Sequence, residues 1–283
     1  MAGSVPATKV VSILNLKGGV AKTTLTVALA DAFAIQGKRV LVVDVDPQCD
    51  TSIMLVGQAR WKDDLHAKNR TLAPFFFQSK EAAEVEACLE PEVSDIRGVH
   101  NISLLAADMK LSDIQNGLLP KGQTVSRAVL ARLLGQLKGL FDLVLIDCPP
   151  NFSILTQNAL AASHSYIMPA IPDYLSLTLA ATRTKEYVER LNNKRPKAPV
   201  KLAGIVLTKY QSNNTVHREL TGRINADNRA LWKDMLRNHI IPQTTDLTEA
   251  AQYDPNRRTN SEKYPQGLSK SFRELATALW PRF

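Results

Sequence analysis

Two lysines flank a pair of glycines near the start of the chain, in the stretch NLKGGVAKTT at residues 15–24. Apolar VVSIL precedes this stretch, and the helix-compatible LTVALADAFAIQG follows it. A glycine-containing loop between a strand and a helix N-terminus directs backbone N–H groups and the positive end of the helix dipole at one point, where phosphates bind. Lys22 is placed for the β- and γ-phosphates of a nucleotide, Thr23 for Mg²⁺ and Thr24 for the α-phosphate. One lysine suffices for this task, so Lys17 needs a separate explanation.

Carboxylates follow two apolar runs further along the chain. LVVDVDPQ places Asp44 and Asp46 just beyond one expected strand, and LVLIDCPP places Asp147 beyond another. Ligands of open α/β sheets bind at the carboxyl ends of the strands. A carboxylate there, close to a phosphate loop, is suited to hold Mg²⁺ or its waters, although strand-end aspartates can also simply cap turns.

The elements that must position these residues are short β-branched runs alternating with helical segments. This alternation predicts an α/β fold, with a mostly parallel twisted sheet and helices on both faces, in a single domain spanning residues 1–283. Strands are expected at Lys9–Leu14, Arg39–Val43, Ile102–Leu105, Leu143–Ile146, Ser165–Pro169, Lys201–Leu207 and His239–Ile241. Helices are expected near 23–36, 124–138, 154–162, 175–191, 227–237 and 268–280.

Residues 53–100 interrupt the alternation and lack clear strand periodicity, so we expect a variable insertion packed on the sheet edge. The segment contains an aromatic triplet, Phe75 to Phe77. The triplet is either a partner-binding patch or, as is commoner for aromatic side chains, buried.

Composition excludes several classes of protein. With 283 residues, of which 45% are hydrophobic, the chain is long enough for a full core. Its three cysteines, Cys49, Cys88 and Cys148, are far apart and form no CxxC, which argues against disulfides, a zinc site or a one-chain iron–sulfur cluster. The sequence has no apolar run long enough to span a membrane and no signal peptide at its start, so we expect a cytoplasmic protein.

The net positive charge is confined to the C-terminal part. Residues 1–180 hold 16 Lys and Arg against 17 Asp and Glu, whereas residues 181–283 hold 19 against 10. This uneven distribution favours a polyanionic partner, either DNA or an acidic membrane surface, and composition alone does not choose between them.

The phosphate loop departs from the usual GxxxxGK[ST] spacing, because Ala21 stands just before Lys22. It resembles the deviant P-loop KGGxxK[ST] of the ParA and MinD group of ATPases, and most closely the ParA or Soj type. The resemblance implies that Lys17 reaches across an ATP-dependent homodimer to the phosphates held by the other protomer. It also implies that residues 17–24 together bind the nucleotide: Lys17, Gly18, Gly19, Val20, Ala21, Lys22, Thr23 and Thr24.

The same resemblance assigns roles to the aspartates. Asp147 resembles the Walker B aspartate acting on Mg²⁺ through water, Asp46 the residue that positions the attacking water, and Asp44 a supporting contact near the metal. The implied reaction is Mg²⁺-dependent hydrolysis of ATP, with Lys17, Lys22 and Asp46 as its catalytic residues. A cation supplied in trans can accelerate such a step by roughly 10³ to 10⁵.

Two later segments extend the resemblance. GIVLTKY and IIPQTTDLTEAA match family segments that place Thr208 and Pro242 near adenine. In the second segment, two arginines of the family's DNA-binding surface are replaced by Gln243 and Asp246. Other basic residues are candidates for nonspecific DNA contacts: Arg218, Arg223, Arg257, Arg258, Lys270 and Arg273.

The family resemblance further implies a ParB-like or other adaptor protein that stimulates hydrolysis, a plasmid, chromosome or protein cargo, and association with the nucleoid. A membrane switch of the MinD type is the main alternative, because GLSKSFRELATALWPRF offers an amphipathic C-terminal helix, although a helix packed on the sheet has the same spacing. The absence of cysteine pairs disfavours a metal-cluster carrier. The absence of a second constellation of acid, base and nucleophile disfavours a small-molecule ligase or kinase.

Overall fold

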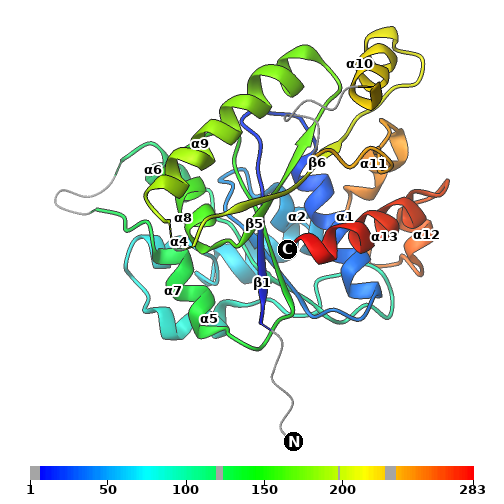
Figure 1. The fold of residues 1–283 in the computed structure, drawn as a ribbon. Helices are drawn as coiled ribbons and strands as arrows, with labels where there is room; N and C mark the ends of the chain where they lie inside the picture. Colours follow the sequence, from blue (N-terminus) through cyan, green and yellow to red (C-terminus); the bar gives the residue numbers. More distant parts are fainter. Residues whose placement is uncertain (1–6, 119–123, 197, 227–233) are drawn as a thin grey trace, which may run out of the picture.

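The computed structural model describes residues 7–118, 124–196, 198–226 and 234–283. A six-stranded parallel sheet forms its centre, in the order β3-β2-β4-β1-β5-β6 (Figure 1). The strands are β1 (Lys9–Ile13), β2 (Val40–Asp44), β3 (Ile102–Leu105), β4 (Leu143–Asp147), β5 (Ser165–Ala170) and β6 (Lys201–Leu207). This topology confirms the predicted fold class.

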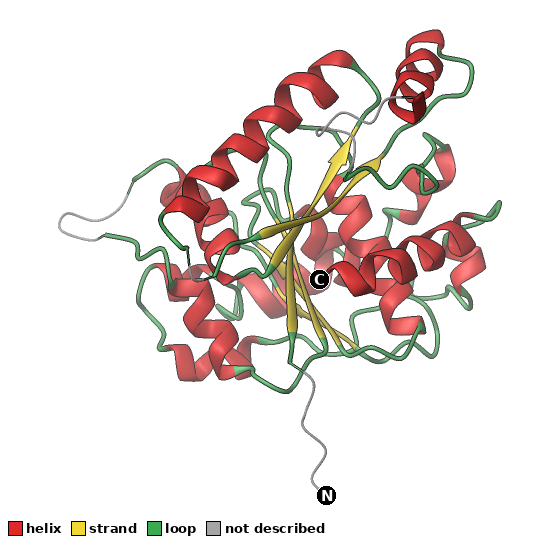
Figure 2. Ribbon diagram, viewed as in Figure 1, coloured by secondary structure: helices red, strands yellow, loops and turns green. Residues whose placement is uncertain are grey.

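Helices cover both faces of the sheet, as Figure 2 shows. On one face α1 packs against α13, and on the other α7 packs against α8. Every residue of β2 and of β4 is buried, as expected for central strands covered on both sides. The longer helices are α1 (Lys22–Ile35), α7 (Val129–Gln136), α8 (Ile154–Ala162), α9 (Ala181–Asn193, continuing a π-helical segment Leu175–Ala180), α10 (Thr215–Ala226) and α13 (Leu268–Leu279).

The expected seventh strand, His239–Ile241, does not join the sheet. In the described part of the chain, Met235 forms an isolated bridge with Ile205 of β6, and Pro242 forms another with Tyr210, which lies beyond the end of β6. A turn closed by His239 N–H and the carbonyl of Leu236 separates the two bridges, so no continuous ladder forms. The expected helix at 227–237 falls mostly outside the described residues. Helix α10 forms in a stretch for which we expected no element.

Residues 53–100 form short helical pieces beside β3, an edge strand of the sheet. Glu90 pairs with Leu104 of β3 in an antiparallel bridge. Phe75 and Phe76 are buried, and Phe77 packs against the same core, so the aromatic triplet offers little exposed surface. The short helices are α2 (Asp50–Val56), α3 (Gln58–Arg60), α4 (Ala73–Phe76) and α5 (Val85–Cys88); α6 (Leu111–Gln115) follows β3, and α11 (Thr245–Ala250) and α12 (Asn260–Lys263) precede α13.

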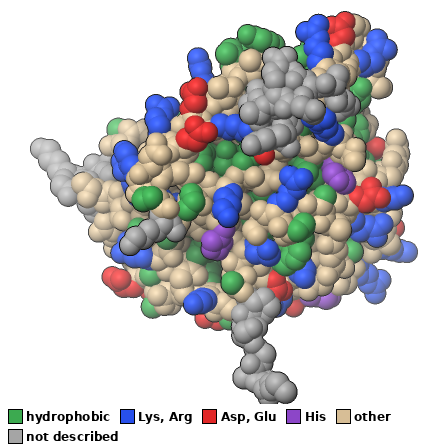
Figure 3. All heavy atoms as spheres, in the orientation of Figure 1, with side chains coloured by type: hydrophobic (Ala, Val, Ile, Leu, Met, Phe, Trp, Pro, Cys, Tyr) green, Lys and Arg blue, Asp and Glu red, His purple; other side chains and the backbone are tan. Residues whose placement is uncertain are grey.

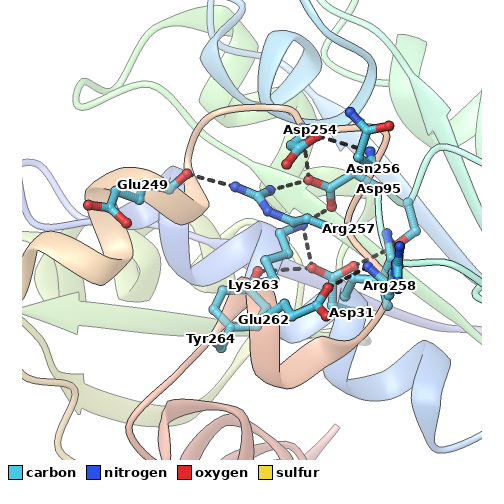
Figure 4. A network of polar contacts seen from close by, with 12 residues as sticks. Asp31, Asp95, Glu249, Asp254, Asn256, Arg257, Arg258, Glu262, Lys263 and Tyr264 are labelled. Atoms are coloured by element: carbon cyan, nitrogen blue, oxygen red, sulfur yellow. Dashed lines mark hydrogen bonds and ion pairs between the residues drawn. The ribbon is translucent and has the colours of Figure 1, made fainter.

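A buried ionic network connects α1 to the C-terminal segment (Figure 4). Lys263 Nζ lies 2.8 Å from Asp31 Oδ2 and 2.6 Å from Asp95 Oδ1, and Arg257 also pairs with Asp95. Burial alone would lower the pKa of Lys263, but the two carboxylates outweigh it and the pKa is raised. Tyr264 donates a further hydrogen bond to Asp31. The network thus fixes α12 and α13 against the helix that follows the phosphate loop.

Candidate active site

The loop between β1 and α1, where we expect phosphates to bind, is held in place by side-chain hydrogen bonds. Asn15 donates to the carbonyl of Pro169 at 2.7 Å and accepts from the Lys17 N–H at 3.0 Å. Thr208, at the end of β6, donates to the carbonyl of Val20 at 3.0 Å. Ala21 precedes α1 with φ 62° and ψ 36°, the left-handed region. A residue with a Cβ pays roughly 1 to 2 kcal/mol there, so Ala21 is a strained substitute for glycine.

Lys22 begins α1 and is 7% exposed. Burial lowers the pKa of its ammonium, while the neighbouring carboxylates of Asp147 and Asp46 act in the opposite direction. The cation therefore lies at the carboxyl ends of β2 and β4, where the sequence places the aspartates. A buried ammonium among carboxylates and loop N–H groups is suited to a polyphosphate.

Lys17 has a different environment, although it stands only five residues earlier. Its Nζ lies 2.8 Å from Oδ2 and 3.0 Å from Oδ1 of Asp173, in the loop after β5. Both side chains of this ion pair are 29% exposed. Asp173 Oδ1 also accepts from the Ser176 N–H at 2.7 Å, which fixes the carboxylate. Lys17 is thus held within its own chain at the protein surface.

Asp147 is buried at the end of β4 and accepts hydrogen bonds from threonine hydroxyls. Thr23 donates to Oδ2 at 2.8 Å and Thr51 at 2.6 Å, while Thr26 makes a longer contact of 3.4 Å with Oδ1. Burial raises the pKa of Asp147 to about 6, although the bonds from Thr51 and Thr23 oppose the shift.

This donor set suits Mg²⁺ held jointly with a nucleotide. Thr23 and Asp147 offer hard oxygen ligands side by side, as the ion prefers. The described residues contain no cluster of three or more His, Cys, Asp or Glu side chains that would form an all-protein metal cage. Mg²⁺ commonly uses one or two protein ligands together with phosphates and water, so the residues present fit the ion.

The other two aspartates lie on either side of Val45. Asp44 is fully buried, and burial raises its pKa strongly. Its Oδ2 accepts from the N–H and hydroxyl of Ser52, and its Oδ1 accepts from the Asp46 N–H at 3.0 Å. Both oxygens of Asp44 therefore have protein donors, which fits the supporting contact near the metal that the resemblance implies. Asp46 is half-buried, and burial raises its pKa.

A cavity of about 270 Å³ adjoins the loop where the base of a nucleotide is expected. Thr208 and Pro242 both line it, together with Ala21 and Thr24 of the loop and Phe272 of α13. The two predicted base contacts are therefore brought together with the phosphate loop, 34 residues apart in the sequence. The mixed apolar and hydroxyl lining is typical of a small-molecule pocket.

The six basic residues expected at DNA do not share one environment. Arg218 and Arg223 of α10 are exposed, as are Arg258, Lys270 and Arg273 near and on α13. Figure 3 shows Lys and Arg side chains over this side of the molecule, from α10 to α12 and α13. Arg257 differs, because its guanidinium binds Asp95 and the carbonyl of Glu249 and its side chain is 11% exposed. Arg257 therefore belongs to the internal network.

The apolar side of α13 is buried rather than presented to the surroundings. Phe272, Leu275 and Leu279 are at most 1% exposed, and Trp280 and Phe283 pack against Phe33 of α1. Within the described residues, no helix combines the length and hydropathy needed to cross a bilayer. All three cysteines are free and buried.

Sequence reasoning did not identify several contact residues of the site, among them Thr51, Ser52 and Asp173. The hydroxyl pair lies three residues after DPQ, with Cys49 and Asp50 in between, so its position shortly after a strand-end aspartate is a usable signal. Asp173 follows a buried strand, as Asp46 and Asp147 do, and the same argument would have found it. Its partner, Lys17, could not be chosen from sequence.

Comparison with known proteins places these features in a family. A family model described as an AAA domain matches residues 8–197. The sporulation initiation inhibitor protein Soj of Bacillus subtilis is 30% identical over 267 residues, 88% of this chain and 93% of Soj. The chromosome partitioning protein ParA of Caulobacter vibrioides is 30% identical over 250 residues, 87% of this chain and 84% of that protein.

The solved structures include a close match of fold. The crystal structure of a cobyrinic acid a,c-diamide synthase from Mycobacterium smegmatis, with bound ADP and magnesium, has a TM-score of 0.67 and 27% sequence identity. The match covers 96% of this chain and 94% of that one. The parallel sheet and the phosphate loop define a P-loop ATPase. The sequence matches are more specific, and the chain belongs to the ParA/Soj family of these ATPases, which confirms the resemblance.

Proposed function

We propose that the protein is an ATP-dependent dimerising switch that binds DNA nonspecifically and, with an adaptor protein, segregates or positions a plasmid, chromosome or protein cargo. The observation that carries this proposal is the division of labour between two lysines of one loop. Lys22 lies inside, among the carboxylates, whereas Lys17 lies at the surface in an ion pair of modest strength. Because this ion pair is partly exposed and weak, Lys17 can leave Asp173 and serve a nucleotide bound to a second copy of the chain.

The residues of one chain would act on ATP in stages. The loop N–H groups and Lys22 bind the phosphates, and Thr23 with Asp147 would hold Mg²⁺, which neutralises charge on the β- and γ-phosphate oxygens when bound. Asp46 accepts a hydrogen bond from the attacking water and so orients it toward the γ-phosphate. Lys17 of the opposite protomer stabilises the charge that develops during transfer. Hydrolysis then depends on dimerisation, and the loss of the γ-phosphate removes the contact that holds the dimer.

The proposal that this chain uses ATP and Mg²⁺ is supported by the ADP and magnesium in the Mycobacterium smegmatis structure. The base would enter the cavity lined by Thr208 and Pro242. The nucleotide would therefore contact α13 through Phe272, whereas Lys270 and Arg273 of the same helix are exposed.

Variants of the three proposed catalytic residues test the switch. Lys22→Ala should abolish nucleotide binding. Lys17→Ala should keep much of the binding but lose ATP-dependent dimerisation and hydrolysis, whereas Asp46→Ala should dimerise and hydrolyse slowly. ATPase rates and light scattering after gel filtration, with ATP and with ADP, measure these outcomes. Full hydrolysis by monomeric Lys17→Ala would show that the trans role is wrong.

DNA binding is supported by the excess positive charge after residue 180 and by the exposed cations on α10 and α13. If each protomer of a dimer neutralises about three phosphates, affinity for random-sequence DNA should fall roughly 10³-fold between 50 and 200 mM salt. Arg218→Ala/Arg223→Ala and Lys270→Ala/Arg273→Ala should each weaken binding in the presence of ATP. Arg257 is excluded from this set because its removal would disrupt the internal network. Equal binding without ATP, or a flat salt dependence, would contradict the proposal.

Partition and cargo positioning are proposed from the names of the relatives, Soj and ParA. An adaptor that stimulates hydrolysis would complete the cycle, and we expect its gene beside that of this protein. On this proposal the protein works in the cytoplasm, in association with the nucleoid. Adding the neighbouring gene product to an ATPase assay with DNA tests the assignment, since a true adaptor should raise the rate.

Two other functions are weaker candidates. A MinD-like membrane switch would have to undock α13, whose apolar residues are buried against α1. Cosedimentation with anionic vesicles, beside a truncation after Ala278, tests it. The name of the Mycobacterium smegmatis structure suggests a synthase, in which ATP would activate a carboxylate. Release of inorganic phosphate that requires cobyrinic acid and an amide donor, and not DNA or a partner, would favour that reading.

A further inference from the structure

We propose that the first turn of α2 positions the aspartates at the ends of β2 and β4, through the adjacent hydroxyls of Thr51 and Ser52. This inference rests on the proposed roles of Asp46 and Asp147. It assigns Thr51 and Ser52 as positioning residues that act through these carboxylates rather than on the substrate.

Thr51 fixes Asp147. Its hydroxyl donates to Oδ2 at 2.6 Å, and Thr51 itself is 0% exposed. Thr23 donates to the same oxygen, so Oδ2 is held from two helices, α1 and α2, at once. Among the residues that the structure describes, the other oxygen is contacted only by Thr26, at 3.4 Å. The two hydrogen bonds fix the rotation of the carboxylate. Thr51 therefore helps to orient Asp147 toward the position where Mg²⁺ would bind between Asp147 and Thr23.

Ser52 fixes Asp44 and, through it, Asp46. The Ser52 hydroxyl donates to Asp44 Oδ2 at 2.7 Å and accepts from the Ala107 N–H at 2.9 Å. Asp44 Oδ1 accepts from the N–H of Asp46 at 3.0 Å. A continuous chain of hydrogen bonds therefore runs from the loop after β3 to the backbone of Asp46. This chain holds the backbone that carries the proposed water-orienting carboxylate.

The pairing of consecutive helix residues with two carboxylates follows from the geometry of the sheet. Asp44 and Asp147 are partners in the register of β2 and β4, so the two carboxyl groups stand at neighbouring strand ends. Strands lie about 4.8 Å apart, and consecutive side chains of an α-helix point about 100° apart around its axis. Adjacent hydroxyls on one helical turn can therefore each reach a different strand. Cys49 at φ 60° turns the chain between Asp46 and α2, which brings that turn over the strand ends.

Paired substitutions separate the two halves of the proposal. Thr51→Val keeps the shape of the side chain but removes its hydrogen bond to Asp147, and Thr51→Ser restores the donor. We expect Thr51→Val to raise the Mg²⁺ concentration for half-maximal ATPase activity about tenfold to a hundredfold. Thr51→Ser should stay near the wild-type value. Ser52→Ala should instead lower kcat about tenfold or more, and leave KM for ATP and the Mg²⁺ requirement unchanged.

Calorimetric binding of ADP provides a readout that does not depend on turnover. With EDTA present, all three variants should bind ADP as the wild type does, which also shows that they are folded. With Mg²⁺ present, the gain in ADP affinity should shrink in Thr51→Val only. If Thr51→Val reduces the folded yield, Thr51→Ala removes the same hydrogen bond and must give the same result.

The proposal would be overturned if Thr51→Val kept the wild-type Mg²⁺ requirement and the wild-type gain in ADP affinity on adding Mg²⁺, or if Ser52→Ala kept the wild-type kcat. Asp147→Asn, measured alongside, separates this failure from a failure of the proposed function. If Asp147→Asn changes the Mg²⁺ concentration needed for ATPase activity and Thr51→Val does not, the positioning role alone is wrong. If Asp147→Asn also keeps the wild-type Mg²⁺ requirement, the metal role of Asp147 is wrong, and so is the positioning role of Thr51.

Discussion

The ion pair between Lys17 and Asp173 should oppose dimerisation, because Lys17 cannot bind Asp173 and the partner's nucleotide at the same time. Asp173→Asn removes the charge but keeps a carbonyl oxygen for the Ser176 N–H, which now bonds Asp173 Oδ1 at 2.7 Å. The local turn should therefore survive, and the main change is the release of Lys17. We expect the variant to dimerise more tightly with ATP than the wild type does.

The size of the effect follows from the exposure of the pair. Both side chains are 29% exposed and the closest distance is 2.8 Å, so solvent screens much of the attraction. Ion pairs of this kind contribute up to about 1 kcal/mol. Two protomers each give up one such pair when the dimer forms, so the variant should gain about 2 kcal/mol, which is roughly a thirtyfold lower dimer Kd.

Sedimentation equilibrium with a non-hydrolysable ATP analogue measures this Kd directly. Asp173→Glu, which keeps the charge, is the matched control and should remain within a few-fold of the wild type. Lys17→Ala/Asp173→Asn should dimerise no better than Lys17→Ala, because the gain requires a free Lys17. An Asp173→Asn dimer that is weaker than the wild-type dimer would refute the reasoning and show that Asp173 itself contributes to the interface.

Other perturbations test the buried charges and the loop. The folded-state pKa of Asp147, about 6, lies above its unfolded value, so its contribution to stability is full below pH 4 and is lost as the pH rises through 6. Asp147→Asn should therefore gain about 1 to 3 kcal/mol relative to the wild type between pH 4 and 7, measured by urea unfolding in EDTA without nucleotide; a constant difference would contradict this. Lys263→Met leaves Asp31 without a cationic partner inside the protein and leaves Asp95 with Arg257 alone, so it should lower the free energy of unfolding by about 3 to 5 kcal/mol, whereas a loss under 1 kcal/mol would mean that the network is hydrated. Ala21→Gly relieves the left-handed strain at φ 62° and should raise the melting temperature by a few degrees or leave it unchanged, and a clear fall would show that the loop tolerates alanine without strain.

The central sheet and the inner part of the site could be predicted from the sequence alone. Six expected strands form within about one residue of their predicted bounds, because runs such as LVVD and LVLID are apolar throughout and suit only strands covered on both faces. The meeting of Lys22, Thr23 and the strand-end aspartates follows from the same pattern. In a parallel sheet all carboxyl ends lie at one edge, so residues that end neighbouring strands are brought together whatever lies between them. Local order in the sequence is enough for this part.

The partners of the remaining charged and hydroxyl groups depend on the tertiary structure. Lys17 meets Asp173, 156 residues away, and Arg257 meets Asp95, 162 residues away, which makes one lysine a surface contact and one expected DNA-binding arginine an internal one. From the sequence alone, arginine and lysine side chains are expected to be solvated, because no sequence pattern identifies their ion-pair partners. The expected seventh strand does not form for a related reason, since the turn from Leu236 to His239 lies just before it and interrupts the pairing with the chain around β6. The sequence therefore determined which side chains lie at the carboxyl edge of the sheet. Only the packing of distant segments decided which charged and hydroxyl side chains have partners within the protein and which are exposed.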